Sequence, residues 1–559
     1  MNERSLLGRG TRRLIAKPVV IYVVVLAAVV LGPLIILESK AAFGNGFIDL
    51  LTYPGMGGII WNTVALAVGS LLIAVTLGTL LAWCVSRSPS SISKYLSLVP
   101  LLPLVVPGVA NTTGWLFLLS PRAGYLNGLM RQIPGLENLI EGPIDIYSMT
   151  WIIILTGFSL TGFVYMYVRS SMQTMGTELE AAARVSGASN LRAFFTVTLP
   201  LIKPAIVYSS GIVLMLGVGQ FTNPLLLGSP KHIDVLTTVL YRTSASFPVN
   251  YSLGAALSAP LVVISLLVMY AQRFAVGDQS RYTVVTGKSN YAGAQGSRWA
   301  TVPVILFGIV ALVLPIGALI LVALSKFWSA SPDFLNLTFD NVSNVLTNPR
   351  TIDALQTSIV TIIIAVLVVV PIGLIAALTM TGSIRASTFM KNAVDLLSTL
   401  PLAMPAAIMG FAVLYAYTSA PFFLYGTTAI IAIAYITLMI PHAVRPQLTS
   451  LISFGHEFSE ASKVSGASRW RTFYAVELPL VRKGTAVACS LVIILLFHEF
   501  AASLMVASAQ TQTVGTLLYS YYTGGIYPEV AVLALLMVVV TAIGMTFAAL
   551  IGGRKVLEQ

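Results

Sequence analysis

The chain has 559 residues, of which 57% are hydrophobic and 9% are charged, and its formal net charge is +12. Soluble globular proteins carry about 25% charged residues, so this composition excludes an ordinary soluble domain and indicates a membrane protein. A net positive charge is compatible with nucleic-acid binding, so the position of the charges along the chain has to decide between the two readings.

Twelve membrane-spanning helices are predicted, six in each half of the chain. A spanning helix needs about 20 apolar residues, and long stretches lack Asp, Glu, Lys and Arg. In the first half these stretches are 18–37, 50–86, 95–121, 146–168, 204–230 and 243–272. In the second half they are 299–325, 354–384, 396–444, 484–508 (with one internal Glu) and 530–553. The 396–444 stretch is long enough for two spans, with a break near Thr418–Pro421, so the expected fold is all-α and polytopic.

The basic residues orient these helices. If the N-terminus is cytoplasmic, only seven of the 32 Lys and Arg residues fall outside, namely Lys40, Arg122, Arg131, Lys231, Arg242, Lys326 and Arg350. An excess of Lys and Arg in cytoplasmic loops is typical of membrane proteins, so both termini are predicted to be cytoplasmic. The charge is an orientation signal, and the expected surroundings are membrane lipid, with no nucleic acid. The first apolar stretch is too long for a signal peptide and is predicted to stay as an uncleaved helix.

An internal repeat sets the domain organisation. Residues 178–201 and 457–480 align at an offset of 279, with 13 identities in 24 positions. A weaker echo relates "PLVVP" (Pro103–Pro107) to "PLAMP" (Pro401–Pro405). With an even number of spans in each half, the repeats are parallel and related by an axis along the membrane normal. The predicted units are a first half (1–271), a cytoplasmic linker (272–298) and a second half (299–559).

The linker contains "TGKS" (Thr286–Ser289), which resembles the end of a phosphate-binding loop. That motif requires a Gly five residues before Gly287, where this chain has Tyr282, and no strand or helix frames it. We therefore expect no ATP site, no cofactor and no enzymatic activity in this chain.

Each repeated segment is predicted to form a short helix, a turn and a second short helix on the cytoplasmic side. Gly187 and Gly466 can take the left-handed conformation that ends a helix. Ser189 and Ser468 are placed to cap the next helix. Pro200 and Pro479 are predicted to mark a turn into the following span. Small residues around the glycine favour close contact with another protein over anchoring in lipid.

The spacing of these segments resembles the EAA loop of ABC importer permeases. In the second half Glu460, Ala461, Gly466, Leu478 and Pro479 follow the pattern, together with Arg471. In the first half Ala182, Gly187, Arg192, Leu199 and Pro200 match, but Ala181 stands where Glu is expected and Glu180 lies one residue early. The Glu contact of the first half is therefore an open question.

The resemblance implies fold, partners and location. It implies the type I ABC importer permease fold in a bacterial inner membrane, with two coupling loops that bind a homodimer of separate ATPase subunits. It also implies an extracytoplasmic substrate-binding protein. The chain as a whole resembles the fused iron(III)-type permeases, which makes ferric iron the expected cargo. Aminoethylphosphonate, thiamine, polyamine or sulfate are the alternatives.

Polar residues of the two fifth spans are the candidates for the transport pathway. Ionisable residues within a span are rare and often functional. His498 and Glu499 lie in the second half, and the repeat aligns Glu499 with Gln220, with Asn223 further along in the first half. In the permease family that the chain resembles, the fifth spans line the central pathway, which implies that Glu499 faces Gln220 across the axis. There Glu499 could contact cargo or could be a structural hydrogen-bond partner. These groups make a poor metal cage, so no tight metal site is expected. Cys84 and Cys489 are read as buried apolar residues.

Three further expectations concern the third spans, an external loop and the class of transporter. The prolines of the two "PLxxP" echoes are predicted to break the third span of each half. The external loop from Pro121 to Tyr147 could dock a binding protein or be a plain connection. A twelve-helix secondary transporter is the alternative from a different class, since two parallel six-helix halves also describe that group.

Overall fold

The structure, a computed structural model, describes residues 7–136, 142–174, 177–276, 297–454 and 457–552. These residues form helices and loops without a strand, which confirms the all-α expectation. The helices of the first half are α1 (Leu7–Phe43), α2 (Gly46–Thr52), α3 (Met56–Arg87), α4 (Ser90–Leu96), α5 (Leu102–Val105), α6 (Gly108–Leu119), α7 (Tyr125–Met130), α8 (Met149–Thr174), α9 (Thr177–Val185), α10 (Asn190–Ala193), α11 (Leu199–Val218), α12 (Leu236–Ala245) and α13 (Tyr251–Val276).

The second half repeats this order with local differences: two helices, α14 and α15, take the place of α1, no α-helix of the described residues corresponds to α5 or α7, and α24 stands where the first half has the π-helical segment Pro224–Gly228. Its helices are α14 (Thr301–Gly308), α15 (Leu314–Leu324), α16 (Asp340–Thr347), α17 (Pro349–Thr381), α18 (Thr388–Thr399), α19 (Ala406–Thr418), α20 (Thr428–Phe454), α21 (Glu457–Val464), α22 (Arg469–Thr472), α23 (Leu478–His498), α24 (Ala501–Val506), α25 (Val514–Thr523) and α26 (Tyr527–Gly552).

Within the described ranges, ten helices are long and apolar enough to cross a membrane. Two bent helix pairs bring the number to twelve if each pair is one span, in agreement with the sequence. Large apolar side chains such as Ile21, Leu72 and Leu367 are more than 60% exposed along these helices. In a bilayer these outward-facing side chains contact lipid, so their exposure is what a spanning helix requires.

The bent pairs are the third spans, and prolines break them as predicted. The helices before and after the break meet at 93° in the first half and at 107° in the second half. Val106 and Met404, which precede Pro107 and Pro405, are extended, with ψ of 126° and 127°. A residue before proline avoids the helical conformation because the proline Cδ clashes with it, so each helix must stop there. The following helix restarts with the proline as its N-cap residue.

The fifth spans end earlier than the apolar stretches predicted. The sequence places them at 204–230 and 484–508, whereas the long helices run over Asn190–Val218 and Trp470–His498. After each helix the chain turns aside into short helical segments, Pro224–Gly228 and α24. Apolar residues continue beyond the ends of both long helices, so the composition alone could not show where these helices end.

Small residues bring the helices of each half close together. A Cβ atom on Gly78 of α3 would lie 2.7 Å from Val164 of α8, and one on Gly373 of α17 would lie 2.8 Å from the backbone of Ala443 of α20. Close backbone approach is how membrane helices associate when lipid is as apolar as their side chains. The side-chain amide of Gln447 adds a polar tie by donating to the Val370 carbonyl at 3.1 Å.

The first helix of each half packs against the other half. Helix α1 contacts α18 and α19, and the Tyr22 hydroxyl donates to the Ile372 carbonyl of α17 at 2.8 Å. In return α14 and α15 contact α3 and α6, with the Phe158 and Phe307 rings 6.1 Å apart. This reciprocal exchange joins the halves through packing as well as through the linker.

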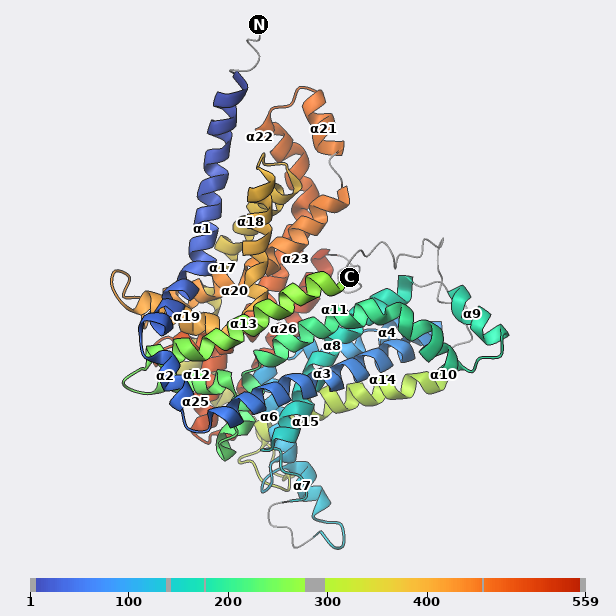
Figure 1. Cartoon of the computed structure of the whole chain (residues 1–559). Coiled ribbons are helices and arrows are strands. Elements are labelled where there is room, and N and C mark those ends of the chain that lie inside the picture. Colours follow the sequence, from blue (N-terminus) through green and yellow to red (C-terminus); the bar gives the residue numbers. More distant parts are fainter. Residues whose placement is uncertain (1–6, 137–141, 175–176, 277–296, 455–456, 553–559) are drawn as a thin grey trace.

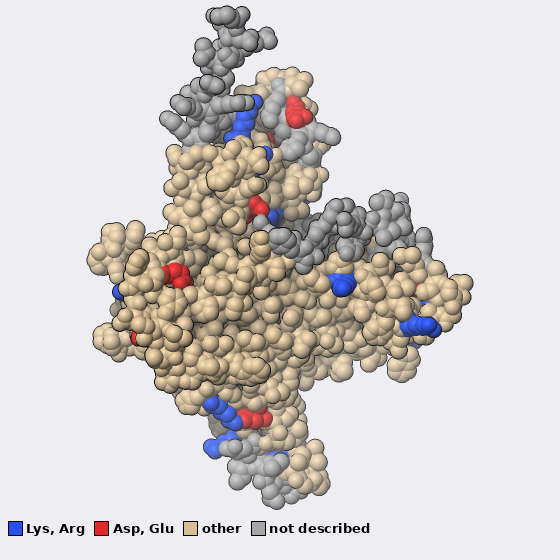
Figure 2. Space-filling view, in the orientation of Figure 1, with Lys and Arg blue, Asp and Glu red and all other residues tan. Residues whose placement is uncertain are grey.

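The two halves diverge on the side of the repeated loops. In Figure 1, α9 and α10 lie at the right end of the molecule and α21 and α22 lie at its top, far from each other. Helices α6, α12, α19 and α25 lie together at the opposite end, at the lower left. Figure 2 shows that charged side chains form small, separate patches on a surface otherwise covered by uncharged residues. The molecule therefore has one end where the halves meet and one where they separate.

Candidate functional site

Each repeated loop folds as the predicted helix–turn–helix. Gly187 and Gly466 have φ of 88° and 82°, the left-handed conformation that favours glycine. The Ala188 N–H bonds back to the Ala183 carbonyl at 3.0 Å, and Ala467 makes the same contact with Ser462 at 3.1 Å. This backward bond closes the end of an α-helix, and it explains why both loops keep a glycine at this position.

The second short helix of each loop is capped by serine, as the sequence predicts. The hydroxyl oxygens of Ser189 and Ser468 accept from the backbone N–H groups of Arg192 and Arg471, both at 3.3 Å. An N-cap side chain satisfies one of the donors that a helix start leaves unpaired. The serine at this position was therefore enough to predict where each second short helix begins.

The predicted turn at Pro200 and Pro479 is wrong. The helix continues through both prolines into the fifth span, from Asn190 to Val218 and from Trp470 to His498. In each half a π-helical turn, Phe194–Thr198 or Phe473–Glu477, stands immediately before the Leu-Pro pair. Proline has no backbone N–H to donate, and its ring clashes with the preceding turn of a regular α-helix. The wider π-helical turn accommodates Pro200 or Pro479, so the helix does not have to stop there.

Most of the predicted coupling residues are exposed. These are Ala182, Gly187, Arg192, Pro200, Glu460, Ala461, Gly466, Arg471, Leu478 and Pro479, while Leu199 is half-buried. Sequence analysis missed a set of exposed apolar side chains at the same repeat offset. They are Val185 and Val464, Leu191 and Trp470, and Phe195 and Tyr474, each more than 60% exposed. Apolar residues repeated at 279 positions on two equivalent loops were the signal that could have found them.

The two loops differ in their acidic residue. Glu180 forms an ion pair with Arg87 at the end of α3, and its side chain is only 12% exposed. The Arg87 guanidinium also lies 4.9 Å from the centre of the Trp83 ring, which packs against Phe194. Glu460 of the other loop is exposed. The one-residue shift of the first-half Glu therefore turns it from the exposed face towards its own half.

Gln220 and Asn223 lie just beyond the end of α11. The side-chain oxygen of Gln220 accepts from the Phe221 N–H at 3.0 Å. The backbone carbonyl of Gln220 accepts from the Thr237 hydroxyl at 2.7 Å. Asn223 is buried, accepts from the Thr112 hydroxyl and donates to Thr156 at 2.8 Å. These contacts join α6, α8 and α12 within the first half.

His498 and Glu499 lie at the end of α23. The His498 ring nitrogen Nε2 is 2.6 Å from the Thr541 hydroxyl of α26. The Glu499 carboxylate accepts from the backbone N–H groups of Ala502 and Ser503 at 2.7 and 2.9 Å, and from the Ser503 hydroxyl at 2.8 Å. The hydrogen bonds of both residues are thus made within the second half, and the Glu499 side chain, one residue before the N-cap Phe500, accepts from N–H groups in the first turn of α24.

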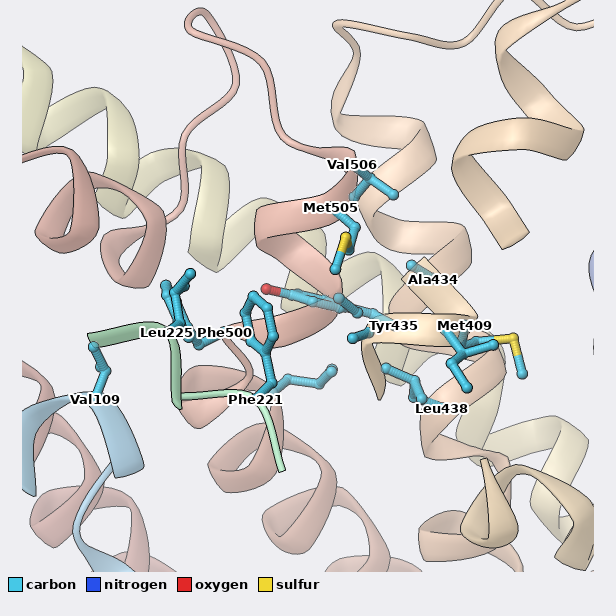
Figure 3. Packing of buried hydrophobic residues seen from close by; sticks show 14 of the residues in the cluster. Val109, Phe221, Leu225, Met409, Ala434, Tyr435, Leu438, Phe500, Met505 and Val506 are labelled. Atoms are coloured by element: carbon cyan, nitrogen blue, oxygen red, sulfur yellow. The ribbon is translucent and has the colours of Figure 1, made fainter. Parts of the chain in front are cut away.

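The side chains that meet between the halves here are aromatic. Figure 3 shows the rings of Phe221 and Phe500 next to each other, and their centres are 5.9 Å apart. Both are almost completely buried. The backbone is also close, since a Cβ atom on Gly219 would lie 3.0 Å from Pro405 of the other half. In the ranges that the structure describes, no group of three or more His, Cys, Asp or Glu residues could hold a metal ion.

This architecture defines a multi-pass helical membrane protein made of two fused halves with the same order of spanning helices. A sequence model of the family described as "Binding-protein-dependent transport system inner membrane component" matches residues 74–278 and again residues 369–555. The chain belongs to this family and carries its domain twice.

Several curated relatives of the chain are permeases as well. The chain is 22% identical over 484 residues to the putative ferric transport system permease protein FbpB 1 of Haemophilus influenzae, covering 85% of this chain and 75% of that protein. It is 22% identical to the ferric transport system permease protein FbpB of Actinobacillus pleuropneumoniae over 462 residues, which are 82% of this chain and 66% of that protein. Among solved structures, a bacterial ABC transporter involved in alginate import matches with 23% identity and a TM-score of 0.36, over 42% of this chain and 86% of that one.

Proposed function

We propose that this chain forms the translocation pathway of an ATP-driven importer, with a separate ATPase dimer bound to its two coupling loops. The carrying observation is the pair of equivalent helix–turn–helix loops, each at the end of a fifth span and each presenting exposed apolar residues. Two equivalent loops match a dimeric motor, one loop for each subunit. In the orientation set by the basic residues, these loops and both termini are cytoplasmic.

The separation of the loops suggests how the motor acts. The halves meet at the end far from the loops and diverge towards them (Figure 1). An ATPase dimer that closes on ATP would draw the loops together and so favour a state in which the coupling side is shut. A bound partner shifts the equilibrium between the open and the shut coupling side only if it has a different affinity for the two states. The closed ATPase dimer binds both loops at once only when the loops are close together, so it favours the shut state.

The proposed cargo is ferric iron, delivered by an extracytoplasmic binding protein. The names of the two curated relatives support this cargo, as does the likeness over most of the chain. The side chains of Gln220, Asn223, His498 and Glu499 hydrogen-bond within their own halves, whereas ferric iron would need several free oxygen ligands for tight binding. High affinity is therefore assigned to the binding protein. Aminoethylphosphonate, thiamine, polyamine and sulfate are the other cargoes that the test must separate.

The experiment is purification of the tagged full chain from its own host in mild detergent, followed by mass spectrometry and reconstitution. The expected result is an ATPase at about two copies per chain, and uptake of ferric iron into proteoliposomes that requires both ATP and the binding protein. Uptake of another of these solutes under the same conditions would replace iron and keep the importer. Recovery of the chain alone, active with an ion gradient and without ATP, would instead establish a secondary transporter.

A further inference from the structure

We propose that four aromatic side chains, Phe221, Tyr241, Phe500 and Tyr519, form the gate that closes the transport pathway on the side away from the coupling loops. We refer to these four residues as the aromatic quartet. The inference rests on the proposed transport function and adds the place and the residues at which the pathway is shut.

The quartet is a closed ring of contacts. The ring centres of Phe221 and Phe500 are 5.9 Å apart, and those of Tyr241 and Tyr519 are 6.1 Å apart. Within each half, Phe221 lies 5.8 Å from Tyr241 and Phe500 lies 5.9 Å from Tyr519. All four distances fall within the 4.5–7 Å range of favourable aromatic pairs.

The repeat places this ring on the axis between the halves. Phe221 and Phe500 are equivalent at the offset of 279, and Tyr241 and Tyr519 are equivalent at an offset of 278 in α12 and α25. A residue can touch its own equivalent only at the axis that relates the two halves. In transporters built from repeats the cargo path lies at the interface of the repeats, so the quartet stands across it.

The quartet also lies on the correct side to act as a gate. The helix α11 runs over Leu199–Val218 between the coupling loop and the quartet. Twenty helical residues span roughly 30 Å, which is the thickness of the hydrocarbon core. On the quartet side the halves are also joined by the Tyr522 hydroxyl, which donates to the Leu226 carbonyl at 2.8 Å. On the coupling side the halves diverge (Figure 1).

The contacts indicate how the gate opens. Each half contributes one Phe–Tyr pair that is held together by contacts within that half. Within the quartet, separation of the halves breaks only the Phe221–Phe500 and Tyr241–Tyr519 contacts, so the two Phe–Tyr pairs move apart as units. Opening then exposes the tyrosine hydroxyls to the cargo at the axis. Phe221 and Phe500 supply the apolar barrier that keeps ions from passing while the gate is closed.

The test measures leak through the full chain reconstituted in liposomes loaded with potassium ions and carboxyfluorescein. Phe221→Ala with Phe500→Ala is expected to release potassium at least tenfold faster than the unmodified chain, with carboxyfluorescein retained. The matched control is Phe158→Ala with Phe307→Ala, which removes another ring pair between the halves, one that lies off the axis. The control is expected to change potassium release by less than twofold. An axial variant that is monodisperse and no leakier than the control would overturn the proposal.

A second measurement covers the case in which the alanine variant does not fold. Tyr241→Cys and Tyr519→Cys are introduced together in a chain with Cys84→Ala and Cys489→Ala, and a reducible bifunctional thiol reagent bridges them. Bridging is expected to lower ATP-driven uptake at least tenfold, with recovery after reduction, and undiminished uptake by the bridged chain would contradict the gate. The leak assay needs neither cargo nor ATPase, so it tests the gate separately from the proposed function. If the unmodified chain imports iron but the Phe221→Ala, Phe500→Ala variant does not leak, only the gate is rejected. If the variant leaks but the unmodified chain transports with an ion gradient and without ATP, only the proposed importer is rejected.

Discussion

The carboxylate of Glu499 accepts three hydrogen bonds, and all of them come from the first turn of α24. An acidic side chain at a helix start satisfies unpaired N–H groups and interacts favourably with the helix dipole. These contacts favour the structural alternative that the sequence left open for this residue.

A capping role predicts that Glu499→Ala lowers stability. Loss of an N-cap costs about 0.5–2 kcal/mol, and Glu499→Gln should cost less because one side-chain oxygen can still accept. Thermal unfolding in detergent, followed with transport assays, measures both effects. Ser503→Ala is the control, since it removes one contact of the carboxylate and leaves the backbone bonds. If Glu499→Ala and Glu499→Gln abolished transport equally at unchanged stability, Glu499 would act on the cargo.

The ion pair between Glu180 and Arg87 predicts unequal roles for the acidic residues of the two loops. Glu460 is exposed and available to a partner, whereas Glu180 holds α9 against α3. We expect Glu460→Ala to weaken ATPase binding about tenfold and Glu180→Ala to weaken it less than threefold. The affinity of the purified ATPase for the reconstituted chain is the measurement. A larger effect of Glu180→Ala would show that the ion pair opens when the ATPase binds.

At the scale of helices, the coupling loops depend on one glycine each. A side chain at Gly466 would meet open space but would be strained at a φ of 82°. Gly466→Trp should therefore leave the chain folded, distort the turn and obstruct the docking partner, so that ATP hydrolysis no longer drives uptake. Hydrolysis and uptake are measured on the same proteoliposomes. Gly55→Trp is the matched control, because Gly55 has a φ of 76° and open space at the start of α3. Equal loss of uptake in both variants would mean that backbone strain, rather than docking, is the cause.

Local signals explain which elements could be predicted from the sequence. The proline breaks, the glycine turn and the serine caps each depend on residues within about four positions, so the sequence located them. The continuous helix through Pro200 and Pro479 was missed because the compensating π-helical turn has no comparable signature. The ends of the fifth spans were missed for a different reason, since apolar residues continue beyond Val218 and His498.

Features of the whole molecule depend on contacts between residues far apart in the sequence. The first helix of one half packs on the other half, where the Tyr22 hydroxyl donates to the Ile372 carbonyl, and no feature of the sequence predicts that contact. The aromatic quartet is an intermediate case, because repeat alignment relates Phe221 to Phe500 and "LTTVLY" to "VGTLLY". Equivalence in a repeat shows which residues could meet at the axis, but only the folded arrangement shows which of them do.

The exchanged helices predict that the two halves stay together without the covalent linker. Chains 1–286 and 287–559, expressed together with a tag on one of them, should purify at a 1:1 ratio, because α1 packs on α18 and α19 while α14 and α15 pack on α3 and α6. Starting the first chain at residue 46 removes α1 and the Tyr22–Ile372 hydrogen bond, and should reduce recovery of the untagged half at least fivefold. The contacts of α14 and α15 remain in that case, so recovery should not fall to zero. Separation of the two full-length halves during purification would show that the linker, and not the exchange, holds them together.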